Sequence, residues 1–153
     1  MHFKKVLVTT DFSDFAAEAF RHVLKDASTD GGSLTLLTVV SDWVVPPSMF
    51  EEIPLPERID EYRKDILESA TERIQKLAAE HFPNRTVETK VILSVRSVAQ
   101  EICDFARSKN CDLIIMASHG RGAVASAILG SVTQKVLGHA PCPVLVVPAH
   151  AGH

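Results

Sequence analysis

Apolar residues follow two different patterns along this chain. Short runs of apolar residues and Thr, bounded by polar or turn residues, are typical of strands buried in a sheet. They occupy residues 5–10, 33–40, 113–117 and 143–147. Residues 86–93 instead alternate Val and Leu with polar side chains, which predicts a strand nearer a sheet edge.

Between these runs, apolar residues recur at three- and four-residue steps, which predicts amphipathic helices. Ser13 is placed to cap the first, which carries an apolar stripe from Ala16 to Leu24. The second covers 57–82, with a stripe of Ile59, Tyr62, Ile66, Ala70, Ile74, Leu77 and Ala78. The third opens on the capping box 97–100 and the fourth covers 131–139.

Strands that alternate with helices predict βαβ units and a parallel sheet. The right-handed crossover rule then predicts one α/β domain over 1–148, a doubly wound, five-stranded, Rossmann-like sheet with helices on both faces, and a short tail over 149–153. Ligands of such sheets bind beyond the carboxyl ends of the strands, where the strand order reverses. Asp11, Val39 and Ala117 are expected at these ends.

Residues 41–56 interrupt the pattern. Four prolines block regular structure there, and Trp43, Met49 and Phe50 lie among them. These apolar side chains either pack on the edge of the core or belong to a flap over a ligand or partner.

Composition narrows the function classes. A net charge of -3 argues against a general nucleic-acid binder, which is usually basic. The chain contains no run of about 18 apolar residues, so no membrane span is expected. Three cysteines without a C-x-x-C pair argue against a disulfide framework or zinc site and favour a reducing, cytoplasmic location. His150 and His153 lie in the tail and predict no metal site.

The candidate chemistry lies after the strand at 113–117. Gly120 and Gly122 follow it in a loop, and Gly130 immediately precedes the last helix. Backbone amides at a helix start suit a phosphate group, and no Asp or Glu follows Asp112 to repel one. The G-x-G-x-x-A match at 120–125 comes after the wrong strand for a dinucleotide fold, and no Walker A loop or serine-hydrolase elbow is present.

The spacing Gly120-x9-Gly130-Ser131 resembles the G-x2-G-x9-G-[ST] motif of the nucleotide-binding branch of the universal stress protein family. The sequences K-K-V-L-V-T-T-D at the start and P-C-P-V-L-V-V-P at the end are similar to that family as well. The resemblance covers the whole chain and is poorest over 41–56. Ala117 stands where the motif has its first glycine, and Thr9 replaces a common proline.

The resemblance implies an ATP or AMP site, with Mg²⁺ possible beside ATP. Thr10 and Asp11 match residues around the adenosine, and Val39 matches a residue whose backbone meets the adenine. The implied phosphate loop and its flanks comprise Ala117, Ser118, Gly120, Arg121 and Gly122, and the implied helix start comprises Gly130, Ser131 and Val132.

Several of these residues also have a purely structural interpretation. Ser131 begins a capping box of its own, over 131–134, Asp11 is placed to cap the first helix, and the glycines suit a plain tight turn. Ser118 and His119 suggest nucleophilic chemistry, but sequence neighbours rarely form the geometry that it needs, so we expect a surface histidine.

The expected function is that of an ATP- or AMP-binding regulatory protein of the stress response, without efficient turnover because no general base with a clear partner is visible. Two alternatives remain open: a nucleotide-free dimer that acts through protein contacts, which Ala117 favours, and a slow ATP-hydrolysing enzyme. The resemblance further implies a homodimer paired through the strand at 143–148.

Overall fold

The computed structural model describes residues 3–26, 32–42, 56–120 and 129–148. Strands and helices alternate throughout: β1 (Lys5–Thr9), α1 (Asp14–Asp26), β2 (Ser33–Ser41), α2 (Pro56–His81), β3 (Val87–Ser94), α3 (Val98–Ser108), β4 (Leu113–Ala117), α4 (Ser131–His139) and β5 (Val144–Val147). The predicted elements are confirmed to within a residue or two at their ends. Trp43, Met49 and Phe50 lie outside the described residues.

The five strands form one parallel sheet in the order β3-β2-β1-β4-β5. The chain proceeds outward from β1 to β3 and then returns to the other side of β1 with β4. Strand order therefore reverses between β1 and β4, and the carboxyl ends of these two strands define the switch point of the fold. β3 is an edge strand, as its alternating pattern predicts.

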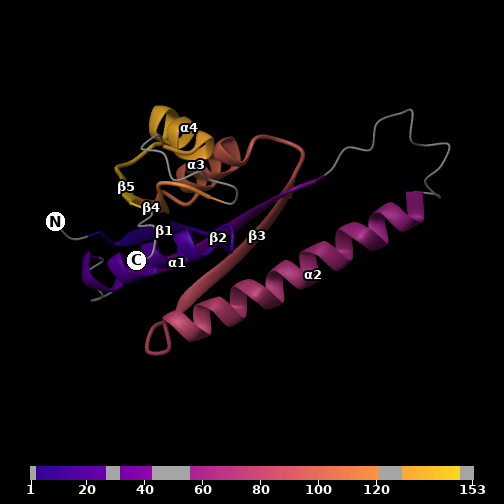
Figure 1. Cartoon of the computed structure of the whole chain (residues 1–153), viewed down its shortest axis with the longest axis horizontal. Coiled ribbons are helices and arrows are strands. Elements are labelled where there is room, and N and C mark those ends of the chain that lie inside the picture. Colours follow the sequence, from indigo (N-terminus) through magenta and orange to yellow (C-terminus); the bar gives the residue numbers. More distant parts are fainter. Residues whose placement is uncertain (1–2, 27–31, 43–55, 121–128, 149–153) are drawn as a thin grey trace.

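Helices cover both faces of the sheet, which confirms the doubly wound prediction (Figure 1). Side chains of α1 and α2, including Phe20 and Ile74, pack with Val8 and Ile115 on one face. Side chains of α3 and α4, including Ile102 and Val136, pack with Leu7 and Ile114 on the other. Consecutive residues of a central strand thus enter opposite cores, which is why these strands are apolar at every position.

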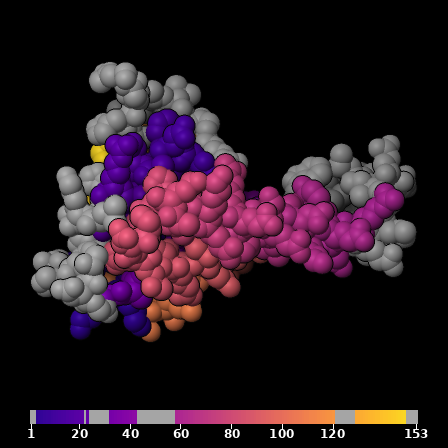
Figure 2. All heavy atoms as spheres, turned by 90° about the horizontal axis from the view of Figure 1, so that it is seen from below, coloured from indigo at the N-terminus to yellow at the C-terminus, as the bar shows by residue number. Residues whose placement is uncertain are grey.

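The predicted stripe of α2 is only partly a core stripe. Ala70, Ile74 and Ala78 are buried, but Tyr62 is 59% exposed. Figures 1 and 2 show the reason, because the first half of α2 projects beyond the body of the molecule. Arg63 of α2 forms an ion pair with Asp42, just after β2, with Nε 2.8 Å from Oδ2, although the N–H is not aligned for a hydrogen bond.

None of the helices in the described ranges has both the length and the apolar character to cross a bilayer.

Candidate functional site

The turn from β1 to α1 brings Thr10 and Asp11 to the switch point. Thr10 is 7% exposed and continues the ladder by donating its N–H to the Leu37 carbonyl. Asp11 Oδ1 accepts hydrogen bonds from the Ser13 N–H at 3.0 Å and the Ser13 hydroxyl at 2.5 Å. Ser13 Oγ in turn accepts from the Ala16 N–H at 3.2 Å, so Ser13 caps α1 as predicted.

Phe12 holds this turn in a conformation that the sequence does not reveal. Its φ is 64°, in the left-handed region that bulky residues avoid. The Thr10 hydroxyl accepts a hydrogen bond from the Phe12 N–H at 3.0 Å, and the Arg73 guanidinium of α2 lies 4.4 Å from the centre of the Phe12 ring. A cation–π contact from a distant helix thus helps to fix the backbone next to Asp11.

The end of β4 is tied to the start of α4. The Ser118 N–H donates to the Val147 carbonyl, and the Ser118 carbonyl accepts from the Gly130 N–H at 2.9 Å. The Thr133 hydroxyl donates to the Ala117 carbonyl at 3.1 Å from within the core. Gly130 packs closely on this segment, since an added Cβ would lie 3.3 Å from the Ser118 oxygen and the backbone would have to shift slightly to accommodate it. These contacts fix the position of the end of β4 relative to the start of α4.

The first turn of α4 is left without a side-chain cap. Gly130 is the N-cap residue, and no side chain in the described part of the chain caps this helix. The alternative in which Ser131 caps its own helix is wrong, because Ser131 is the first helical residue and Gln134 Nε2 instead donates to the Leu129 carbonyl. Uncapped amides and the positive helix end make this a suitable place for an anionic group.

Gly120 and Asp11 meet although they are far apart in sequence. A Cβ added at Gly120 would lie 2.5 Å from Asp11 Oδ2, so a larger residue there would displace the Asp11 carboxylate from its present position. Neither Gly120 nor Gly130 has a positive φ, so glycine at these positions serves close approach rather than a left-handed backbone. One carboxylate oxygen of Asp11 thus accepts hydrogen bonds from Ser13, the cap of α1, and the other lies next to Gly120 after β4.

This contact makes a prediction. We expect Gly120→Ala to lower the free energy of unfolding by about 1–2 kcal/mol, because the new methyl group displaces the Asp11 carboxylate from Ser13. In an Asp11→Ala background the same change should cost roughly 1 kcal/mol less. Urea unfolding of the four proteins measures this coupling, and strict additivity would contradict the contact.

Val39 lies on the same edge. The pairing of β1 with β2 ends at Thr9 and Leu37, whereas β2 continues beside β3 as far as Ser41 and Ser94. Val39 therefore extends past the end of β1, on the switch-point side of the sheet, with its side chain packed partly against the core of α3 and α4. Ala117 is 8% exposed, so its methyl group is largely buried.

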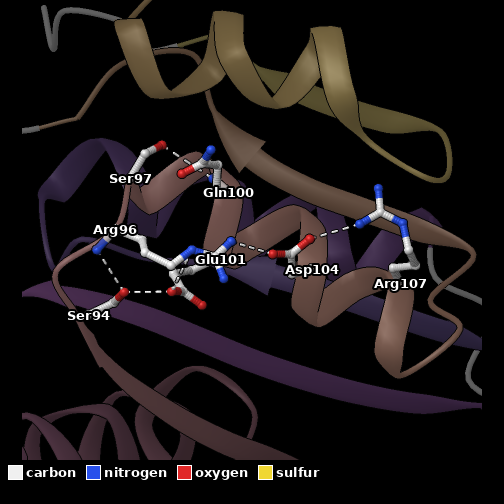
Figure 3. A network of polar contacts seen from close by, with 7 residues as sticks. All are labelled: Ser94, Arg96, Ser97, Gln100, Glu101, Asp104 and Arg107. Atoms are coloured by element: carbon white, nitrogen blue, oxygen red, sulfur yellow. Dashed lines mark hydrogen bonds and ion pairs between the residues drawn. The ribbon is translucent and has the colours of Figure 1, made fainter.

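The turn from β3 to α3 borders this edge and is fixed by polar contacts (Figure 3). The Ser94 hydroxyl donates to Glu101 Oε1 at 2.5 Å and accepts from the Arg96 N–H at 3.0 Å. Arg96 reaches over α3 to Asp104, which Arg107 contacts from the other side at 2.8 Å. Ser97 caps α3 by accepting from the Gln100 N–H, as predicted. The hydrogen bond from Arg96, together with both positive charges, lowers the pKa of Asp104.

The lowered pKa of Asp104 predicts a pH dependence. A carboxyl whose folded pKa lies below its ordinary 3.8 stabilises the fold above that value, and the contribution is lost as the pH falls through the folded pKa. We expect Asp104→Asn to be less stable than the parent at neutral pH, with the difference narrowing below about pH 4. Urea unfolding between neutral and acidic pH measures this, and parallel curves would contradict it.

Ser118 and His119 differ from expectation. Ser118 is 6% exposed, and its hydroxyl lies 2.9 Å from His119 Nδ1, so these neighbours do form a hydrogen bond. In the sequence, the only indication of this hydrogen bond is that the two residues are adjacent. The backbone conformation decides whether such neighbours contact each other.

The predicted residues are only partly brought together. Thr10, Asp11, Ala117, Ser118, Gly120, Gly130, Ser131 and Val132 lie around the ends of β1 and β4 and the start of α4. The Val132 side chain packs into the core, so only the backbone of Val132 is available to contact a ligand. Arg121, Gly122, His150 and His153 lie outside the described residues. Within the described ranges, no group of three or more His, Cys, Asp or Glu side chains could hold a metal ion.

Solved structures share this fold. A structure of MJ0577 from Methanocaldococcus jannaschii superposes with a TM-score of 0.78 at 29% identity, covering 97% of this chain and 98% of that one. An Arabidopsis thaliana universal stress protein family protein with AMP bound is similar in fold, with a TM-score of 0.60 at 18% identity over 97% and 93% of the two chains.

Sequence comparison agrees with the fold. The universal stress protein MJ0531 of Methanocaldococcus jannaschii is 33% identical over 148 residues, which cover 95% of this chain and 82% of that protein. The model of the universal stress protein family matches residues 2–148. This chain therefore belongs to the universal stress protein family.

Proposed function

We propose that this chain binds an adenine mononucleotide, ATP or AMP, at the switch point between β1 and β4, and acts as a regulatory protein rather than a catalyst of rapid turnover. The start of α4 carries this proposal. No side chain among the described residues caps it, and it lies where the Gly130 backbone packs against Ser118 and where Gly120 meets Asp11. Helix-start amides would hold the phosphates, and Ser131 would add a hydroxyl donor.

The other parts of the proposed site fit the rest of the nucleotide. Asp11 offers carboxylate oxygens to the donors of a ribose or base, and Val39 offers backbone atoms beyond the end of β1. Relatives of this fold supply further support, since the Arabidopsis protein holds AMP. Bound nucleotide would add its binding free energy to the stability of the β4–α4 connection.

Equilibrium dialysis with labelled ATP and AMP tests the proposal, with and without Mg²⁺. We expect saturable retention at submillimolar nucleotide. Ala117→Gly restores the glycine of the family motif and serves as the diagnostic variant. Retention by Ala117→Gly alone would identify the methyl group as the obstacle, and no retention by either protein at millimolar nucleotide would favour the alternative of a nucleotide-free protein-binding dimer.

We further propose a homodimer through β5. Among the described strands β5 forms one edge of the sheet, and Val144, Leu145 and Val146 are only half-buried there. An apolar edge strand is a ready template for a second copy. Analytical ultracentrifugation should give a dimer that Val146→Lys converts to monomer, and a monomeric parent protein would contradict this proposal.

A further inference from the structure

The fold brings together cysteines that are distant in sequence. Cys103 is buried in α3, Cys111 precedes β4, and Cys142 precedes β5. All three pack into the core between the sheet and the layer of α3 and α4. The cluster lies at the amino ends of β4 and β5, at the opposite edge of the sheet from the proposed nucleotide site.

Two of these cysteines precede neighbouring strands. The pairing of β4 with β5 begins at Ile114 and Val144, and the Ile114 N–H donates to the Pro143 carbonyl at 3.0 Å. Cys111 lies three residues before Ile114 and Cys142 two residues before Val144, and both side chains pack into the same core. Neighbouring strands are about 4.8 Å apart, and a disulfide requires about 4.4–6.8 Å between its Cα atoms, so this placement suits a disulfide.

Both positions are rigidly held. Asp112, next to Cys111, accepts the N–H groups of Lys4 at 2.7 Å and Lys5 at 2.9 Å and donates its own N–H to the Lys5 carbonyl. The Cys111 N–H donates to the Ala106 carbonyl at the end of α3. Cys142 lies between Pro141 and Pro143, whose rings restrict the backbone on either side. Little additional ordering is therefore needed to bring the two sulfurs together.

We propose that Cys111 and Cys142 form a reversible disulfide bond. This bond would link the residue two positions before β4 to the residue two positions before β5, and so join the two ends of the segment that contains β4 and α4. The oxidant is a small disulfide such as oxidised glutathione. One protein thiolate attacks it and releases the first glutathione thiol. The second protein thiolate then attacks the mixed disulfide and releases the second thiol. The protein loses two protons and two electrons, which appear in the two reduced glutathione molecules.

The surroundings make this reaction slow. Burial, followed by the nearby charges of Cys111, Asp112 and Cys103, raises the pKa of Cys142 to about 11. Burial also raises the pKa of Cys111, with Asp112 adding to the effect and Lys5 and Lys109 opposing it. Since the thiolate is the nucleophile, oxidation should accelerate about tenfold per pH unit in the mildly alkaline range.

The test is exposure of the full chain to oxidised glutathione, followed by intact mass and peptide mapping without reduction. We expect the parent protein and Cys103→Ala to lose about 2 Da, with Cys111 and Cys142 in one linked peptide pair. The midpoint of thermal unfolding should rise by on the order of 10 °C and return on reduction. Cys111→Ala and Cys142→Ala should show neither change.

Peptide mapping of the parent protein decides the question even if a variant does not fold. Three persistent thiols, a stable glutathione adduct, a link to Cys103 or a link between two chains would each overturn the proposal. The test needs no nucleotide, so its outcome is separate from that of the proposed function.

Discussion

Gly130→Asp is expected to weaken ATP binding by about 100-fold or more while leaving the protein folded. Gly130 has φ -61° and ψ 154°, an extended conformation that Asp adopts readily as an N-cap. The new carboxylate would accept hydrogen bonds from the first turn of α4, occupy the amides proposed to hold the phosphates and repel the nucleotide. A gain of about 1 kcal/mol from capping would offset the crowding of the new Cβ against the Ser118 carbonyl.

Two matched variants separate the causes. Gly130→Asn caps the helix without a negative charge, so its loss of affinity should be smaller. Gly138→Ala lies on the same helix, where an added Cβ meets nothing within 4 Å, and should leave binding unchanged. Isothermal titration with ATP and thermal unfolding together measure affinity and folding. Equal affinity of the parent and Gly130→Asp would exclude the start of α4 as the phosphate site.

Phe20→Ala should produce the largest loss of stability, about 3–5 kcal/mol. Phe20 is 1% exposed in the core between α1, α2 and the sheet. Its ring lies edge-to-face with Phe82 at 5.6 Å and with His81 at 4.9 Å between centroids, so truncation removes both buried area and aromatic contacts. Urea unfolding with the fluorescence of the single Trp, or with circular dichroism, measures the change.

Tyr62→Ala is the control for this prediction. Tyr62 belongs to the apolar stripe of α2 by spacing, yet it is 59% exposed. Its truncation should change the free energy of unfolding by less than about 0.5 kcal/mol. If both variants lost similar stability, the projection of α2 beyond the sheet would be wrong.

The contrast between Phe20 and Tyr62 shows how far periodicity predicts burial. Spacing identifies the face of a helix that is apolar, but burial also requires a partner for that face. Ile74 and Ala78 pack with strand residues in one core, whereas Tyr62, in the first half of α2, is exposed. The length of the sheet relative to the helix is a tertiary property that no local pattern contains.

The candidate site likewise combines features that the sequence predicts with features that only the structure reveals. The spacing of Gly120 and Gly130, the acidic residue after β1 and the start of α4 at Ser131 were all predicted from the sequence, and the structure places them around one switch point. The sequence left open whether Ser131 caps its own helix. It carried no signal for the contact of Arg73 with Phe12 or for the fit of the Asp11 carboxylate against Gly120.

The sequence by itself determined the order, type and approximate bounds of the strands and helices, because apolar periodicity, caps and breakers act within a few residues. Only the tertiary structure decided which oxygen of Asp11 faces Gly120, that Ser118 meets His119, and that the cysteines share one core. The Ser118–His119 contact depends on the backbone conformation after β4. The other two outcomes depend on strand register and helix docking, which bring together residues as much as a hundred or more positions apart and leave no local trace in the chain.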